Sequence, residues 1–132
     1  MSRRLKWFII SRIRSIRYAF SGWWHVIRTQ RNAWIHAIFS LLVVVISFWL
    51  RLSTQEWALI ILAITLVWTA EFINTAIEAV VDLASNHQRH NLARVSKDVG
   101  AAAVLIAALA SILIGLLILG PPLWAKIQTL IQ

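Results

Sequence analysis

The chain has 132 residues, of which 60 % are hydrophobic and only 14 % are charged, and it contains no cysteine. This composition lies outside the range of soluble domains and predicts one all-α integral membrane domain over residues 1–132; disulfides and thiolate metal sites are excluded. The net charge is +8, but eight of the thirteen Lys and Arg residues fall within the first 31 positions, which indicates an anionic membrane surface as partner and no nucleic acid.

The basic amino-terminal segment, residues 1–31, has helical periodicity. Apolar residues recur from Ile13 to Ile27 on one face, while Arg14 and Arg17 lie on another. This pattern predicts an amphipathic helix that lies in the membrane surface. The sequence leaves open whether this helix only anchors the topology or also covers a ligand site at the cytoplasmic face.

Three later stretches are long enough to cross a bilayer, which takes about 20 apolar residues. They are residues 33–50, 57–83 and 99–119. A polar loop, 85–98, separates the second span from the third, and Pro121 and Pro122 are expected to end the last helix. The loop and the amino-terminal region hold eleven Lys and Arg residues. We therefore expect both in the cytoplasm, below a plasma (inner) membrane, with the carboxyl terminus outside.

The third span is rich in small residues. Gly100, Ala103, Ala107, Ser111 and Gly115 recur every three or four positions. This spacing lets helices approach closely in lipid, so it predicts tight helix packing and no chemistry of its own.

The second span carries three of the five acidic residues, in the run EFINTAIEAVVD at 71–82. At about 100° per residue, Glu71, Asn74, Glu78 and Asp82 fall within an arc of roughly 80°. Counted from Trp57, Glu71 is expected just inside the inner membrane boundary, with Glu78 roughly 10 Å closer to water. Because a charged group near hydrocarbon costs a few kcal/mol, this face is a candidate functional site.

The depth of these carboxylates favours one kind of chemistry. A carboxylate at the boundary can meet a lipid head group, and one nearer the cytoplasm can meet a Mg²⁺-bound phosphate. Lys97 and Asp98, at the start of the third span, add a cation and an oxygen at the same level. The arrangement suits phosphoryl transfer to a membrane-embedded acceptor, although no Walker sequence or Gly-rich phosphate loop is present.

Other interpretations of the same residues stay open. Polar groups on one face also hydrogen-bond between helices of an oligomer. Glu71 and Glu78 would equally suit a proton or cation pathway, but the stretch 57–70 offers only Thr65 and Thr69 as further polar groups. The histidines show no metal-ligand spacing, and we expect interface or loop roles for them. They are His25, His36, His87 and His90.

Several short runs of the sequence resemble the motifs of a known family. The run ExxNTAIExVVD at 71–82, followed by SKDVGAAAVL at 96–105, resembles the small prokaryotic diacylglycerol kinase family, which includes undecaprenol kinases. YAFSG at 18–22 and RNAWIH at 31–36 extend the resemblance, which covers roughly residues 12–119.

The resemblance implies an ATP- and Mg²⁺-dependent lipid kinase that phosphorylates diacylglycerol or undecaprenol, built as a homotrimer with active sites shared between subunits. It implies that Glu71 is the general base and that Glu78 binds metal and nucleotide. The other implied nucleotide-binding residues are Tyr18, Asn74, Arg89, His90, Lys97 and Asp98. Beside Glu71, Arg31 and Trp49 are the candidates for contact with the lipid substrate.

The sequence departs from the family pattern at two places. Gln30 stands where the family usually has a second metal-binding Glu, so it remains a metal candidate with a carbonyl oxygen but no charge. The loop is one residue longer and has Gln88 where an acidic residue is common. A kinase inactivated by Gln30 would share this fold, and the sequence leaves that alternative open.

Overall fold

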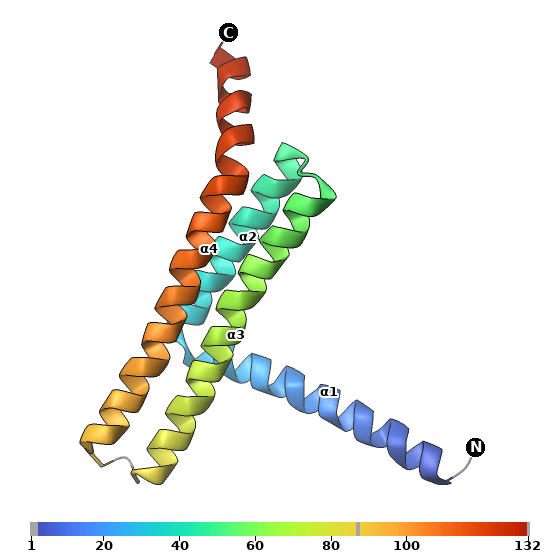
Figure 1. Ribbon diagram of the computed structural model, residues 1–132. Helices are drawn as coiled ribbons and strands as arrows, with labels where there is room; N and C mark the ends of the chain where they lie inside the picture. Colours follow the sequence, from blue (N-terminus) through green and yellow to red (C-terminus); the bar gives the residue numbers. More distant parts are fainter. Residues whose placement is uncertain (1–2, 87, 132) are drawn as a thin grey trace.

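The computed structural model describes residues 3–86 and 88–131, and every regular element in these ranges is an α-helix. The helices are α1 (Arg3–Thr29), α2 (Arg31–Leu50), α3 (Thr54–Ala84) and α4 (Asn91–Ile131). α2, α3 and α4 run up, down and up as a bundle, and α1 leads away from it (Figure 1). These three bundle helices are long and apolar enough to cross a membrane, which confirms the predicted all-α fold with three candidate spans. His87 lies outside the described residues.

The connections between the first three helices are short. Only Gln30, in an extended conformation (φ −100°, ψ 117°), separates α1 from α2, so the chain changes direction within one residue. α2 ends at a left-handed Arg51 (φ 56°), and α3 begins with a capping box in which Ser53 and Glu56 bond each other's backbone N–H groups. These tight turns set α2 and α3 antiparallel and side by side.

One stripe of α3 forms the centre of the bundle. Ile60, Ala63 and Val67 are buried at helical spacing, and the same stripe continues downward as Glu71 and Asn74. Apolar packing therefore gives way to polar groups along a single face, at the depth where the sequence places the candidate site.

Small residues of α4 pack against this stripe. Gly100 and Ala107 are buried, and the Ser111 hydroxyl donates a hydrogen bond to the Ala63 carbonyl at 2.9 Å. The predicted close packing is confirmed for these three positions, whereas Ala103 is exposed.

Two predicted boundaries of the last helix are wrong. Pro121 and Pro122 do not end α4, which continues to Ile131, because each proline removes only one backbone N–H and keeps a φ that suits a helix. The segment 85–98 is a loop only as far as His90. Residues 91–98 contain neither Gly nor Pro and extend the helix, since a polar helical turn gives no apolar signal.

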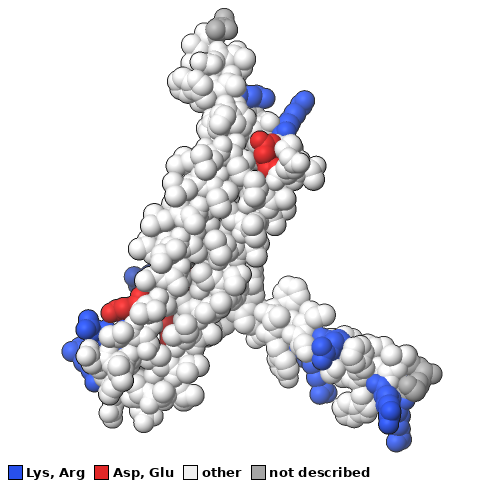
Figure 2. Space-filling view, viewed as in Figure 1, with Lys and Arg blue, Asp and Glu red and all other residues white. Residues whose placement is uncertain are grey.

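On the face shown in Figure 2, surface charge lies toward the ends of the bundle and along α1. Figure 2 shows Lys and Arg along α1 and at the turn between α3 and α4, with a broad uncharged band over the middle of the bundle. α4 alone has 41 residues, or roughly 60 Å of helix, against a hydrocarbon core of about 30 Å, so it extends beyond the core. The uncharged band is the part that fits hydrocarbon.

We predict that Ala63→Leu destabilises the bundle by about 1–3 kcal/mol, because the added side chain overpacks the contact of α3 with α4. Thermal or chemical unfolding in detergent measures the effect. Ala58→Leu is the matched control, since Ala58 is exposed on the same helix. Equal stability of the two variants would contradict the packing described here.

Candidate functional site

Two amide groups orient the Glu78 carboxylate, one from the link between α1 and α2 and one from α3 itself. Its Oε2 accepts a hydrogen bond from Gln30 Nε2 at 3.2 Å, and its Oε1 accepts one from Asn74 Nδ2 at 3.0 Å. Gln30 makes no side-chain cap for α2, because its side chain reaches α3 instead. The structure thus brings together Gln30, Asn74 and Glu78, and both carboxylate oxygens of Glu78 are oriented by neutral N–H donors.

Gly100 on α4 leaves the room that Asn74 needs. A Cβ at position 100 would lie only 2.3 Å from Asn74 Oδ1 and 3.4 Å from its Cγ. Asn74 is itself only 6 % exposed, so its amide has little space into which it can turn. The glycine therefore allows the orientation in which Asn74 donates to Glu78.

Glu71 lies deeper and is 1 % exposed. Its backbone carbonyl accepts a hydrogen bond from the Thr75 hydroxyl, but within the described residues its carboxylate oxygens accept none. His36 Nε2 on α2 lies 3.8 Å from Glu71 Oε2. Burial of a charge without a hydrogen-bonded partner is costly. The structure therefore indicates a functional role for Glu71, as does the presence of an acidic residue in an apolar span of the sequence.

The two carboxylates form two levels between the antiparallel α2 and α3. Gln30 meets Glu78 at the lower level, and His36 meets Glu71 at the upper one. The six-residue step on α2 spans roughly 9 Å and the seven-residue step on α3 roughly 10 Å, so the two levels match in register. The predicted depth difference between Glu71 and Glu78 corresponds to these levels.

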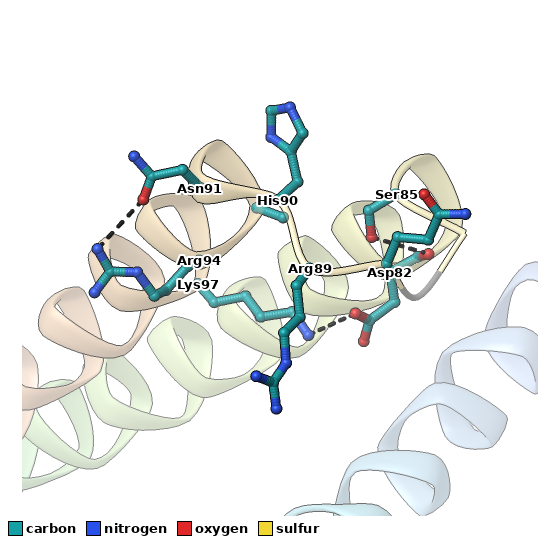
Figure 3. Close-up of a pocket in the computed structure, with 9 residues that line it drawn as sticks. Asp82, Ser85, Arg89, His90, Asn91, Arg94 and Lys97 are labelled. Atoms are coloured by element: carbon teal, nitrogen blue, oxygen red, sulfur yellow. Dashed lines mark hydrogen bonds and ion pairs between the residues drawn. The ribbon is translucent and has the colours of Figure 1, made fainter.

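A basic pocket opens at the turn between α3 and α4 (Figure 3). Its lining begins on α3 at Asp82, which comes one helical turn after Glu78. The pocket has a volume of about 550 Å³. Its lining residues are Asp82, Ser85, Gln88, Arg89, His90, Asn91, Ala93, Arg94 and Lys97. The Lys97 ammonium pairs with Asp82, and the Arg89 guanidinium projects on the same side of the loop (Figure 3). The pocket offers positive charge of the kind that phosphates bind.

The side chains of the remaining candidates are exposed. Tyr18 is 71 % exposed on α1, roughly 18 Å along the helix from Gln30. Asp98 is exposed and pairs with Arg94 at 3.9 Å. Trp49 is at the far end of α2, roughly 20 Å from His36, beneath Lys126. Arg31 is exposed at the start of α2. Within one chain, Tyr18 and Trp49 are not brought to Glu71 or Glu78.

Two residues contribute to the site in ways that the sequence does not predict. For His36 the sequence predicts an interface or loop role, whereas the structure places its Nε2 3.8 Å from Glu71 Oε2. Its position in the RNAWIH motif is the one sequence signal for this contact. Gly100 was interpreted as a packing residue, although its contact is with a site residue. His90 has the expected loop role, since its Nδ1 accepts the Leu92 N–H at 3.2 Å.

Over residues 3–86 and 88–131, no three His, Asp or Glu side chains cluster to hold a metal ion. Glu78 nevertheless offers a carboxylate beside the Gln30 amide, and Asn74 Oδ1 is a buried oxygen without a hydrogen-bond partner in the described chain. A Mg²⁺ ion that arrives with nucleotide phosphates needs only one or two protein carboxylates. The donor set therefore fits a phosphate-borne Mg²⁺, and not a metal site built from protein ligands alone.

Comparison with known proteins decides the family. Residues 17–119 match the family described as prokaryotic diacylglycerol kinase. The chain belongs to this family. Similar proteins include the diacylglycerol kinase of Synechocystis sp., 40 % identical over 83 % of this chain and 62 % of its own length, and the undecaprenol kinase of Bacillus subtilis, 41 % identical over 83 % and 89 %. The diacylglycerol kinase of Escherichia coli is 39 % identical over 63 % and 73 %.

The resemblance predicted from the motifs is thus confirmed, and it identifies an enzyme of the lipid kinase class in a multi-pass membrane protein. The matched residues include α2, α3 and the part of α4 that packs on Asn74. Both carboxylate levels and the basic pocket lie inside the matched region. The chain is almost equally identical to a relative named for diacylglycerol and to one named for undecaprenol. Sequence identity alone therefore does not select the acceptor.

We predict that Gly100→Ala lowers lipid kinase activity by about tenfold or more, because the new methyl group turns Asn74 away from Glu78 and removes a hydrogen bond to a charged group, worth about 1.5–3 kcal/mol. Gly115→Ala is the matched control on the same helix, since nothing lies within 4 Å of the added Cβ. Initial rates in detergent micelles measure both variants. Equal activity of the two would show that Asn74 does not need this space.

Proposed function

We propose that the chain transfers the γ-phosphate of ATP to the hydroxyl group of a membrane lipid alcohol, either diacylglycerol or undecaprenol. The observation that carries the proposal is the two-level arrangement of carboxylates. Glu71 is buried in the bundle, where only a membrane-bound acceptor can reach it, and Glu78 lies two turns closer to the basic pocket. Family membership supplies the class of reaction.

Glu71 is the general base of the proposed reaction. Its carboxylate takes the hydroxyl proton of the acceptor while the hydroxyl oxygen forms a bond to the γ-phosphorus. The bond from that phosphorus to the β–γ bridging oxygen breaks, and ADP leaves with the electron pair. A carboxylate without hydrogen bonds from the described chain keeps its oxygens available for this proton.

Glu78, with the Gln30 amide oxygen, is the proposed holder of nucleotide-bound Mg²⁺. Held there, Mg²⁺ would supply positive charge against the phosphates. Asn74 orients Glu78 and stands next to the nucleotide. Lys97, Arg89 and His90 belong to the loop pocket, where the polyphosphate meets positive charge.

The complete site is proposed to form between subunits of a homotrimer. Tyr18 is exposed and far along α1 from Gln30, and Asp98 is exposed, so as nucleotide contacts they are proposed to act on the site of a neighbouring subunit. α1 is the proposed amphipathic surface helix, with its basic face on anionic head groups and with the amino terminus in the cytoplasm. Arg31 and Trp49 remain proposed lipid contacts, at the head-group level and at the opposite interface respectively.

We expect the purified protein, with Mg²⁺ and labelled ATP, to phosphorylate at least one of diacylglycerol and undecaprenol presented separately in micelles. Glu71→Gln should lower the rate by at least 10²-fold, because it keeps the shape but loses the base. Lipid extraction followed by chromatography measures the product. No labelled lipid from either acceptor would contradict the proposal and favour a non-catalytic relic or an ion pathway.

We predict that Gln30→Glu lowers the Mg²⁺ concentration needed for half-maximal activity, because it places a second carboxylate beside Glu78. The same variant should be less stable than the wild type without Mg²⁺, since two carboxylates about 3 Å apart repel each other. Mg²⁺ titrations of activity and of melting temperature measure the two effects. An unchanged Mg²⁺ requirement would count against a metal role for Gln30.

A further inference from the structure

The side chain that faces Glu71 has no role in the function described so far. His36 Nε2 lies 3.8 Å from Glu71 Oε2, and the nitrogen and both carboxylate oxygens are buried without a hydrogen-bond partner in the described chain. Polar atoms buried in this way are rare in native proteins and call for a ligand or a functional explanation. Here the unpartnered atoms of two side chains face each other.

Aromatic packing fixes the ring of His36. Trp68 meets the imidazole edge-on, with ring centroids 6.4 Å apart, and the Trp68 indole N–H is itself held by the Ser40 hydroxyl at 3.2 Å. On its other side Trp68 stacks on Trp23 of α1 at 5.7 Å. The ring is therefore positioned by contacts that leave Nε2 free to bond something else.

The distance between the two side chains suits one bridging oxygen that lies beside the pair, off the line between the two atoms. A separation of 3.8 Å is too long for a direct hydrogen bond, but an oxygen can lie within 2.6–3.2 Å of both atoms at once. A hydroxyl group has one proton to donate and lone pairs that accept, so it can donate to the Glu71 carboxylate and accept from a neutral imidazole N–H. An acyl or isoprenoid chain offers neither.

We propose that His36 is the second residue of the acceptor site, with its Nε2–H donating a hydrogen bond to the hydroxyl oxygen of the lipid alcohol while Glu71 accepts the hydroxyl proton. This inference rests on the kinase function proposed above. During transfer His36 keeps its proton and points the oxygen lone pair toward the γ-phosphorus, and the hydroxyl proton goes to Glu71. His36 thus touches the reacting oxygen directly.

The arrangement also explains how an apolar substrate is chosen by its one polar group. In the bound complex the hydroxyl satisfies both buried side chains, whereas an ester at the same place leaves Glu71 without a donor. Sites built to hydrogen-bond a hydroxyl discriminate strongly against analogues that lack it. The acceptor is therefore selected as an alcohol at this level, and its chain type is selected elsewhere.

His36→Phe tests the inference, because it keeps a ring against Trp68 but removes the donor. We expect kcat/KM for the acceptor alcohol to fall about 30-fold and the KM for ATP to stay within about twofold of the wild type. His36→Gln, whose amide N–H reaches about the same place, should stay within about fivefold of the wild type. His25→Phe is the matched control, since His25 is exposed on α1.

A binding measurement without ATP complements the kinetics. The alcohol that the wild type phosphorylates should raise its melting temperature in detergent more than the acetate ester of that alcohol does, and His36→Phe should lose this difference. An active wild type whose His36→Phe variant stays within threefold in kcat/KM overturns the inference and leaves the kinase function intact. Equal losses in His36→Phe and His36→Gln, or a matching rise in the KM for ATP, also overturn it. A wild type inactive on both alcohols overturns the kinase function together with the inference.

Discussion

The antiparallel register of α2 and α3 is the constraint on which the site depends. Gln30 must reach Glu78 for His36 to face Glu71, because six residues of α2 and seven of α3 cover almost the same length. The register is set at the opposite end, where the capped turn through Arg51 and Ser53 leaves three residues between the helices. A change in that turn would shift both carboxylate levels together, since a helix transmits a displacement along its whole length.

The close approach of α4 to α3 completes this arrangement. Gly100 admits the Asn74 amide, and further up Ser111 bonds the Ala63 carbonyl, so small residues let α4 approach α3 over more than ten residues. In lipid the hydrophobic effect does not drive contacts between helices, so the association of α3 with α4 depends on close van der Waals packing. The same small-residue stripe therefore stabilises the bundle and shapes the Glu78 side of the site.

The sequence predicted most of the fold and half of the site. Apolar runs located three spans, and helical spacing placed Glu71, Asn74 and Glu78 on one face, because both signals lie within single helices. The contacts of His36 with Glu71 and of Gly100 with Asn74 join residues 35 and 26 positions apart, which no periodicity records. The continuation of α4 past Pro121 was missed because a proline forbids one hydrogen bond and not a helix.

The packing above Glu71 bears on the choice between a kinase and an ion pathway. Toward the turn at Ser53 the buried stripe of α3 consists of Val67, Ala63 and Ile60, which offer no group that could carry a proton. Below Glu71 the stripe is polar as far as the basic pocket. A pathway across the membrane needs polar or ionisable groups on both sides of a buried carboxylate, whereas a phosphotransfer site needs them only toward the nucleotide. The one-sided arrangement fits transfer to an acceptor whose hydroxyl enters from the lipid and whose phosphate arrives from water.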